Sequence, residues 1–174
     1  MLRKAVYTGS FDPITLGHLN VIERSRKLFD VLVVGIGCNA EKAALFAPDE
    51  RLDLVRQVTR DMDNVQVEVF DGLAVDFVRH VGARIMVRGV RPLTDIAAEF
   101  TMTMANRQLA DDLETVFLMA DARFAHVSSS LIKQVAPLAD DWQMARFIPQ
   151  EIISALRGKL GGKSDSPTPP APPH

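Results

Sequence analysis

The stretch "YTGSFDPITLGHLN", residues 7–20, joins the end of an apparent strand to the start of a helix. Gly9 lets the backbone pass close to a ligand, and Ser10 and Phe11 follow with main-chain N–H groups that can face an anion. His18 adds a side-chain donor in the first turn of the helix. The stretch therefore indicates a phosphate-binding loop; the alternative is a simple turn followed by a histidine on the surface.

Outward from this loop, short β-rich runs alternate with helical patterns along the chain. The runs that favour strands are residues 4–7, 31–37, 65–70, 84–89 and 115–120. Helical patterns cover about 17–29, the segment from Pro48, 73–81, the segment from a Thr94 cap to about Asp112, 128–135 and the segment from Pro149. This alternation predicts an α/β fold: a Rossmann-like, doubly wound, five-stranded parallel sheet with flanking helices and a C-terminal helix.

The long helix that ends near Asp112 has more apolar residues than one buried stripe needs. They include Ile96, Phe100, Met104 and Leu109. Apolar surface on a helix usually joins a core, so we expect core packing here and treat an interface as the second possibility.

Composition and charge limit the classes of function. The 174 residues are 47% hydrophobic and 24% charged, and 20 Lys and Arg against 22 Asp and Glu give a formal net charge of −2. Such a chain is globular, without a general attraction to nucleic acid or to anionic membranes. We expect one domain over residues 1–160, followed from residue 161 by a disordered tail rich in Pro, Gly and Ser.

Features that bind metals or span membranes are scarce in the sequence. Cys38 is the single cysteine and the four histidines are scattered, so we expect neither an internal disulfide nor a metal cluster. The start "MLRKAVY" lacks the apolar segment of a secretion signal, and no apolar run approaches the ~20 residues that cross a bilayer. The sequence predicts a cytoplasmic protein without nucleic-acid or membrane partners.

Three polar stretches follow strands, where parallel α/β sheets bind their ligands: residues 8–18, 88–91 and 121–130. Their meeting at one edge of the sheet would make a ligand site. In the third, "VSSS" at 127–130 places three hydroxyls at a helix start. One serine explains a helix cap, and the others can meet phosphate oxygens.

Two arginines mark the second stretch. Arg88 and Arg91 flank Gly89 just after a strand, and paired guanidiniums suit bidentate recognition of phosphate. The alternative is a pair of surface salt bridges, with Asp95 or Glu99 as partners.

A second glycine-rich stretch, "GIGCNA" at 35–40, matches the dinucleotide-binding fingerprint, with Asp61 near the expected distance. That fingerprint should open directly into a helix, whereas the next clear helix begins at Pro48. We therefore favour a strand with small residues at a crowded end over a dehydrogenase. Lys42, just beyond, has the character of an ordinary solvated lysine.

The motif "TGSFDPITLGH" at 8–18 resembles the T/PG(S/T)FDPxTxGH motif of bacterial phosphopantetheine adenylyltransferases, the TxGH branch of the nucleotidyltransferase superfamily. The likeness continues through "NAEK", "RGVR", "NRQL", "ETVFLMA" and "VSSSLIKQV", and spans roughly residues 3–160. Such enzymes transfer the adenylyl group of ATP to 4′-phosphopantetheine, with magnesium, and release dephospho-coenzyme A and pyrophosphate. The resemblance also implies a homohexamer, a dimer of trimers, and coenzyme A as a feedback inhibitor.

The resemblance assigns a role to each matched residue. His18 would be catalytic, stabilising the transition state at the α-phosphate of ATP. The substrate-binding residues would be Ser10, Lys42, Ala74 (through its backbone) and Arg88. The ATP side would be lined by Ser10, Phe11, His18, Gly89, Val90, Arg91, Glu99, Phe124, Ala125, His126, Val127, Ser128, Ser129 and Ser130. No side chain is expected to bind the metal, because magnesium would be held by triphosphate and water.

The residues present agree with this chemistry. The nucleophile would be a phosphate oxygen, largely ionised at neutral pH, so no catalytic base is needed. One departure concerns "DIAAE" at 95–99, where the family often has an acidic-aromatic-acidic stretch. Two rival functions remain open: a sister nucleotidyltransferase with another phosphate acceptor, and a nucleotide-binding protein without catalysis.

Overall fold

The structure, a computed structural model, describes residues 2–38, 43–90 and 96–161. Within these, one parallel sheet has the strand order β3-β2-β1-β4-β5. Its strands are β1 (Lys4–Gly9), β2 (Val31–Cys38), β3 (Val65–Asp71), β4 (Ile85–Val90) and β5 (Glu114–Met119). The first strand, β1, lies in the middle of the sheet. The chain adds β2 and β3 on one side of β1, then crosses over and adds β4 and β5 on the other side. The predicted five-stranded, doubly wound sheet is confirmed, and the strand order reverses between β1 and β4.

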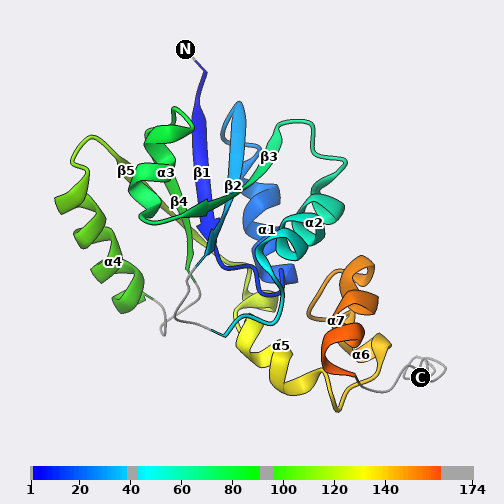
Figure 1. Cartoon of the computed structure of the whole chain (residues 1–174). Helices are drawn as coiled ribbons and strands as arrows, with labels where there is room; N and C mark the ends of the chain where they lie inside the picture. Colours follow the sequence, from blue (N-terminus) through cyan, green and yellow to red (C-terminus); the bar gives the residue numbers. More distant parts are fainter. Residues whose placement is uncertain (1, 39–42, 91–95, 162–174) are drawn as a thin grey trace.

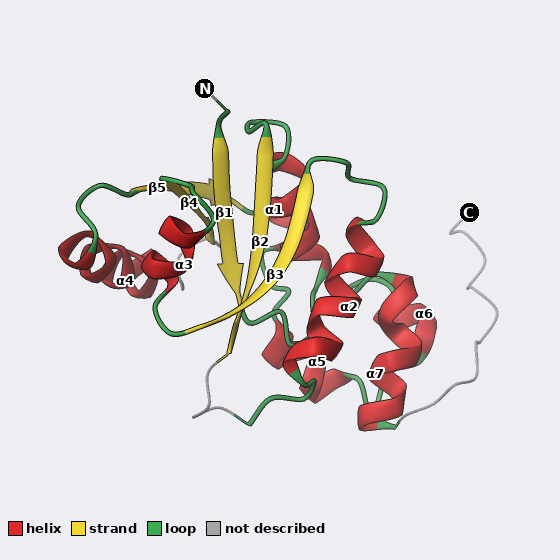
Figure 2. Cartoon of the chain, turned by 45° about the horizontal axis from the view of Figure 1, so that its top comes forward, coloured by secondary structure: helices red, strands yellow, loops and turns green. Residues whose placement is uncertain are grey.

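Helices cover both faces of the sheet (Figures 1 and 2). One face carries α1 (Leu16–Ser25) and α2 (Pro48–Thr59), and the other carries α3 (Ala74–His80) and α4 (Ile96–Leu109). Beyond the carboxyl ends of the strands lie the 3₁₀ turn η1 (Ala122–Phe124), α5 (Ser129–Val135), α6 (Asp141–Met144), η2 (Gln150–Ile152) and α7 (Ile153–Leu160). The helical end cap is thus built entirely from the chain that follows β5.

Alternation along the central strand divides the core into two clusters. Ala5 and Tyr7 face α1 and α2, whereas Val6 faces α3. Val6 lies opposite Val33 of β2 on one side and Met86 of β4 on the other, so one apolar row crosses the middle of the sheet. Burial on both faces explains why β2 is a continuous apolar run rather than an alternating one.

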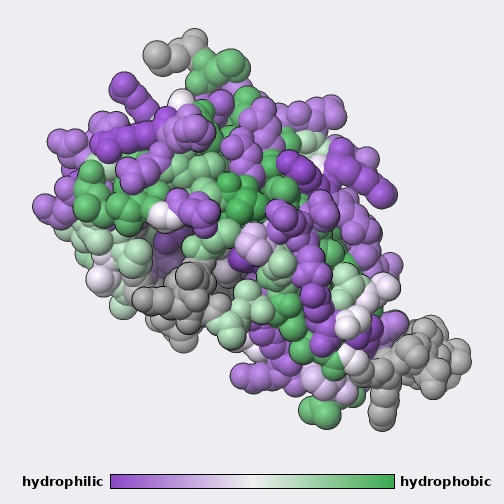
Figure 3. All heavy atoms as spheres, viewed as in Figure 1, coloured by the Kyte–Doolittle hydropathy of each residue, from purple (hydrophilic) through white to green (hydrophobic). Residues whose placement is uncertain are grey.

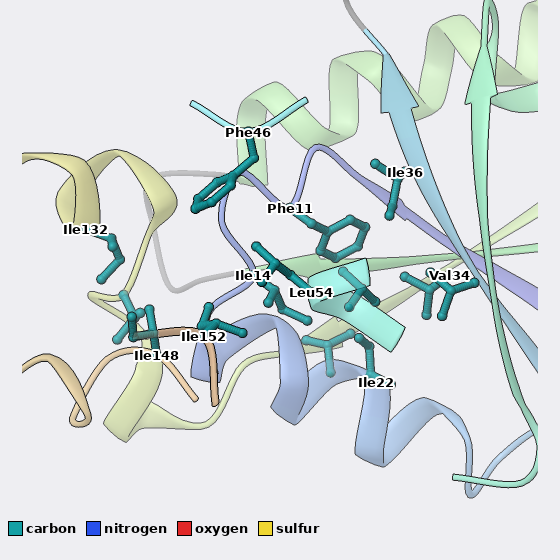
Figure 4. Packing of buried hydrophobic residues seen from close by; sticks show 14 of the residues in the cluster. Phe11, Ile14, Ile22, Val34, Ile36, Phe46, Leu54, Ile132, Ile148 and Ile152 are labelled. Carbon is teal, nitrogen blue, oxygen red and sulfur yellow. The ribbon is translucent and has the colours of Figure 1, made fainter. Parts of the chain in front are cut away.

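The larger cluster extends past the sheet into the helical end cap. Phe11 and Ile14, from the loop after β1, are 0% exposed and lie between Ile36 of β2 and the end-cap residues Ile132, Ile148 and Ile152 (Figure 4). Fully burying a side chain of this kind stabilises the fold by about 1.5–3 kcal/mol relative to leaving it exposed. The loop is therefore part of the core.

The glycines of "GIGCNA" lie in a strand, as we favoured. A Cβ on Gly35 would stand 2.5 Å from Cε1 of Phe77, and that ring stacks on Phe70 with centroids 4.5 Å apart. Position 35 has no room for a side chain. The next described helix is α2, which starts at Pro48.

The C-terminal ends of two helices differ from the prediction by three or four residues, and one helix was missed. Helix α1 ends at Ser25, whose Oγ donates to the Val21 carbonyl at 2.6 Å, and the residues up to Phe29 form turns. Helix α4 ends at Leu109 rather than near Asp112, and its predicted cap, Thr94, lies outside the described residues. Helix α6 was not predicted. The predicted tail also lies outside the described residues, apart from residue 161.

The prediction that the apolar set of α4 joins the core is wrong for the described side chains. Phe100 is 57% exposed, Met104 45% and Leu109 54%, and apolar residues gather over α4 in the space-filling view (Figure 3). The helix packs on β4 and its C-terminal neighbour Ala110 is buried, so one narrow face meets the sheet. Its further apolar residues face outward. Within the described residues, no helix is both long and apolar enough to cross a membrane.

Candidate active site

A cavity of about 290 Å³ opens where β1 and β4 end, at the reversal of strand order. All three predicted stretches contribute to it. The predicted residues that line it are Ser10, His18, Arg88, Gly89, Glu99, Phe124, Val127, Ser128, Ser129 and Ser130. It is also lined by Tyr7, Thr8, Gly9, Thr15, Gly17, Val21 and Ala120.

The other predicted residues that the structure describes do not line this cavity. Val90 is buried at the end of β4, and Ala74, the first residue of α3, packs against the core. The ring of Phe11 is fully buried in the core. Ala125 is half-buried next to the exposed His126, whose ring meets Phe147 edge-on with centroids 6.0 Å apart. Lys42 and Arg91 lie outside the described residues.

Phe11 shapes the loop after β1. Its φ of 47° lies in the left-handed region, which costs a non-glycine residue on the order of 1–3 kcal/mol. Burial of the ring offsets this cost: the ring meets Tyr7 edge-on at 5.5 Å and His18 at 5.1 Å. A Cβ on Gly9 would stand 3.0 Å from the tip of the ring. The glycine therefore leaves room for the Phe11 ring; it also lines the cavity, and its predicted contact with a ligand stays a prediction.

His18 is held by the N-terminus of its own helix. The Thr15 main-chain N–H donates to Nδ1 of His18 at 3.1 Å, and the Thr15 hydroxyl accepts from the His18 main-chain N–H at 3.3 Å. A main-chain N–H can only donate, so Nδ1 must be the acceptor. In the neutral ring the hydrogen therefore sits on Nε2. The capping box makes His18 an oriented N–H donor in the lining of the cavity.

Arg88 is partly neutralised where it lines the cavity. Its Nη1 donates to the Thr8 hydroxyl at 3.1 Å, and its Nε lies 2.9 Å from Oε2 of Glu99. Nε of Arg88 and Oε2 of Glu99 have no hydrogen-bond partner among the described residues, because the two groups are close but poorly aligned. The salt bridge considered for Glu99 is thus present. Because its Nε makes no aligned hydrogen bond, the Arg88 guanidinium keeps donor capacity for an anion.

The three serines before and within α5 have different surroundings. Ser128 caps the helix and accepts from the Leu131 main-chain N–H at 3.1 Å. The Ser129 hydroxyl donates to the Pro13 carbonyl at 2.8 Å, and Ser130 is exposed in the lining of the cavity. One serine therefore serves the helix, as expected, and another ties the helix to the loop after β1.

Two buried side chains that sequence reasoning missed hold this loop from beneath. Arg51 of α2, 4% exposed, donates through Nη1 to the carbonyls of Ser10 at 2.9 Å and Gly37 at 3.2 Å. Asp12, 5% exposed, accepts from several donors far along the chain. No local pattern signals such contacts, because the partners are 14 to 121 positions away.

Asp12 is ionised in this setting. Burial by itself would raise the pKa of its carboxyl, but hydrogen bonds from Lys133 and from the Leu45 and Phe46 amides outweigh burial and lower the pKa below its usual value. The Lys133 ammonium lies 2.5 Å from Oδ2 of Asp12. The loop therefore carries a buried, ionised carboxylate that is paired with Lys133.

The donors at the cavity suit a metal ion that arrives on a phosphate. The described residues contain no group of three or more His, Cys, Asp or Glu side chains that could hold a metal. Among those that line the cavity, Glu99 is the one carboxylate, and it faces Arg88. Mg²⁺ commonly keeps several waters and binds mainly through substrate phosphates, so this donor set is compatible with it.

Residues 6–135 match the Cytidylyltransferase-like family. The chain is 66% identical over 161 residues to the phosphopantetheine adenylyltransferase of Rhodopirellula baltica, covering 92% of this chain and 90% of that one. It is 43% identical over 159 residues to the enzyme of the same name from Clostridium beijerinckii, covering 91% and 99%.

Solved structures with similar folds include the nicotinic acid mononucleotide adenylyltransferase of Plasmodium falciparum. In its complex with NaAD it superposes with a TM-score of 0.61 at 13% identity, covering 91% of this chain and 96% of that one. Likeness at this identity shows the fold alone, whereas the close sequence relatives specify the branch. The chain belongs to the phosphopantetheine adenylyltransferase family, within the wider cytidylyltransferase-like group.

Proposed function

We propose that the chain transfers the adenylyl group of ATP to 4′-phosphopantetheine, giving dephospho-coenzyme A and pyrophosphate. The observation that carries the proposal is the orientation of His18. Thr15 makes Nδ1 of His18 an acceptor, so Nε2–H is the donor in a cavity that is also lined by hydroxyl groups and Arg88. Such a site can bind and polarise phosphates. Relatives named for this reaction, at 66% and 43% identity, support the choice of substrates.

In the reaction, an oxygen of the acceptor phosphate attacks the α-phosphorus of ATP. The new P–O bond forms as the bond to the β-phosphate breaks, and that electron pair leaves with pyrophosphate. The attacking oxygen is already ionised at neutral pH, so no side chain has to remove a proton. His18 donates from Nε2 to an α-phosphate oxygen, where negative charge develops, and so lowers the barrier by electrostatic stabilisation.

The remaining roles divide the site between its two substrates. Arg88 would turn from Glu99 to the acceptor phosphate, together with Lys42, and the main-chain N–H groups at Ser10 and Phe11 would meet phosphate oxygens. Ser130 and the nearby serines, with Arg91, would hold the triphosphate. Mg²⁺, bound to the triphosphate and water, would supply further charge neutralisation.

The variant His18→Ala tests the proposal directly. Removing one preorganised donor to a developing charge should lower kcat by about 10²–10³-fold, while calorimetric ATP affinity stays within about threefold of wild type. His80→Ala is the matched control, since His80 is an exposed histidine at the end of α3. Unchanged turnover in His18→Ala would remove His18 from the mechanism. ATP binding without turnover in the wild type, with any acceptor, would support the binding-protein alternative.

We propose that six copies assemble as a dimer of trimers. The support is the resemblance to the family together with the exposed apolar side chains of α4 and of its neighbour β5. Those side chains are Phe100, Met102, Met104, Leu109, Phe117 and Met119. An uncovered apolar surface of this kind favours association. Light scattering after gel filtration should give six times the 19.2 kDa mass of the chain, and a monomer would contradict the assembly.

Coenzyme A is proposed as an inhibitor of the same site, because it contains both the pantetheine arm and an adenosine. If coenzyme A binds this site, raising the concentration of either ATP or the acceptor should relieve the inhibition. Inhibition that persists at high concentrations of both would contradict the proposal. We propose a cytoplasmic location, and the support is the Cys38 thiol, which stays reduced in that compartment. Cell fractionation tests that location.

A further inference from the structure

The loop after β1 is anchored at successive positions by different parts of the chain. Arg51 of α2 holds the Ser10 carbonyl, and Ser129 of α5 holds the Pro13 carbonyl. Between them, the Asp12 carboxylate is the meeting point of three segments. The loop is therefore positioned by its neighbours as much as by its own turn.

Each oxygen of Asp12 has its own partner on the segment before α2. Oδ2 accepts from the Leu45 main-chain N–H at 2.9 Å, and Oδ1 accepts from that of Phe46 at 2.8 Å. Leu45 lies three positions after Lys42, the residue that the resemblance assigns to the acceptor phosphate. Asp12 thus ties the described residues that follow Lys42 in the sequence to the loop that carries Ser10.

The same carboxylate binds α5 through Lys133, whose Nζ lies 2.5 Å from Oδ2. Ser129 and Lys133 are four residues apart, so they lie on one face of the helix. From this face Lys133 binds Asp12 and Ser129 binds Pro13, the next residue of the loop. Asp12's side chain is 7% exposed and that of Lys133 35%. A buried charge pair of this kind loses much of its support when one partner is removed, because the remaining charge stays buried.

We propose that Asp12 and Lys133 are a positioning pair that holds the acceptor-side segment 43–47 and the ATP-side helix α5 in fixed relation to the phosphate-binding loop. The inference rests on the proposed adenylyl transfer, which requires two phosphates to be held in line. Misplacing reacting groups by about 1 Å can cost about 10²-fold in rate. The pair acts through the residues it holds and does not touch the substrates.

The variant Lys133→Met tests this, because methionine keeps the apolar stem and removes the ammonium. We expect kcat to fall roughly ten- to hundredfold, with calorimetric ATP affinity within about threefold of wild type. Main-chain hydrogen exchange at Leu45 and Phe46 should speed up, since their acceptor is less firmly held. Lys133→Arg, which keeps the positive charge, should recover most of kcat.

Lys159→Met is the matched control. Lys159 is exposed to the same 35% and forms an ion pair at 2.8 Å with Glu50, and neither residue lines the cavity. Because the Lys159 ammonium lies 5.6 Å from the centre of the Phe46 ring, the control compares kcat alone, which should stay within about twofold of wild type. A loss equal to that of Lys133→Met would overturn the proposal, because any lost ion pair would then do the same.

Two further results would overturn it. Unchanged kcat and unchanged exchange in Lys133→Met would reduce the pair to an ordinary contact. A fall in ATP affinity that accounts for the whole loss of kcat/KM would make Lys133 a direct phosphate ligand. The exchange measurement needs no turnover, so it decides on the pair even if the wild type uses a different acceptor or none.

Discussion

Thr15→Val tests how firmly the start of α1 orients His18. Valine keeps the shape of threonine but lacks the hydroxyl that accepts from the His18 main-chain N–H at 3.3 Å and lies 3.1 Å from its Nδ1. Thr15 is 1% exposed, so bulk water has little access to the hydroxyl. Loss of a helix N-cap costs about 1 kcal/mol. In a chain of this length, that corresponds to a fall in Tm of about 2–4 °C.

The same change should reach the chemistry. The ring of His18 keeps the hydrogen bond from the Thr15 main-chain N–H but loses its second neighbour at Nδ1. One hydrogen bond of about 1 kcal/mol corresponds to about fivefold in rate, so we expect kcat to fall about fivefold. ATP affinity should stay within about twofold, because the ring is misoriented rather than removed.

Calorimetric melting and steady-state kinetics measure the two effects. Thr15→Ser is the control, since serine keeps the hydroxyl and loses only a methyl group. A Thr15→Val protein whose Tm and kcat both equal those of Thr15→Ser would refute the idea that the hydroxyl seats His18.

Three further outcomes follow from packing and charge. Gly35→Ala, whose Cβ would stand 2.5 Å from the Phe77 ring, should cost about 1–3 kcal/mol in urea unfolding. Gly158→Ala, within α7 and with open space around it, should instead stabilise by about 0.5–1 kcal/mol in the same assay. The lowered pKa of Asp12 contributes stability at neutral pH that is lost as pH falls through its folded value. The unfolding free energy of wild type should therefore drop more steeply below about pH 4 than that of Lys133→Met; parallel curves would contradict this.

Sequence patterns among neighbouring residues were sufficient to predict the strands of the sheet. The apolar run at 31–37 became β2, and Pro48 opened α2 at its first position. The same patterns did not predict where a helix ends when the turn that follows it continues the apolar spacing of the helix. Phe29 continues the stripe of α1 and packs against the core, yet it does so from a turn, so α1 was predicted four residues too long. The capping box of Asp140 and Gln143 was a readable signal for α6 that was missed.

The site was predictable in outline because its stretches all follow strands. Topology alone brought His18, Arg88 and the serines to one cavity. The support beneath them was not predictable, since Asp12 meets a lysine 121 positions away. The exposed side of α4 shows a second limit of sequence reasoning. The apolar content of a helix does not tell whether one of its faces packs on its own sheet or on another surface.

The most direct test of the account is pyrophosphate release with ATP and Mg²⁺, measured with three acceptors: 4′-phosphopantetheine, nicotinamide mononucleotide and glycerol phosphate. We predict release with 4′-phosphopantetheine alone, with dephospho-coenzyme A identified by mass. Release with a different acceptor, or none in protein that binds ATP, would contradict the proposed function.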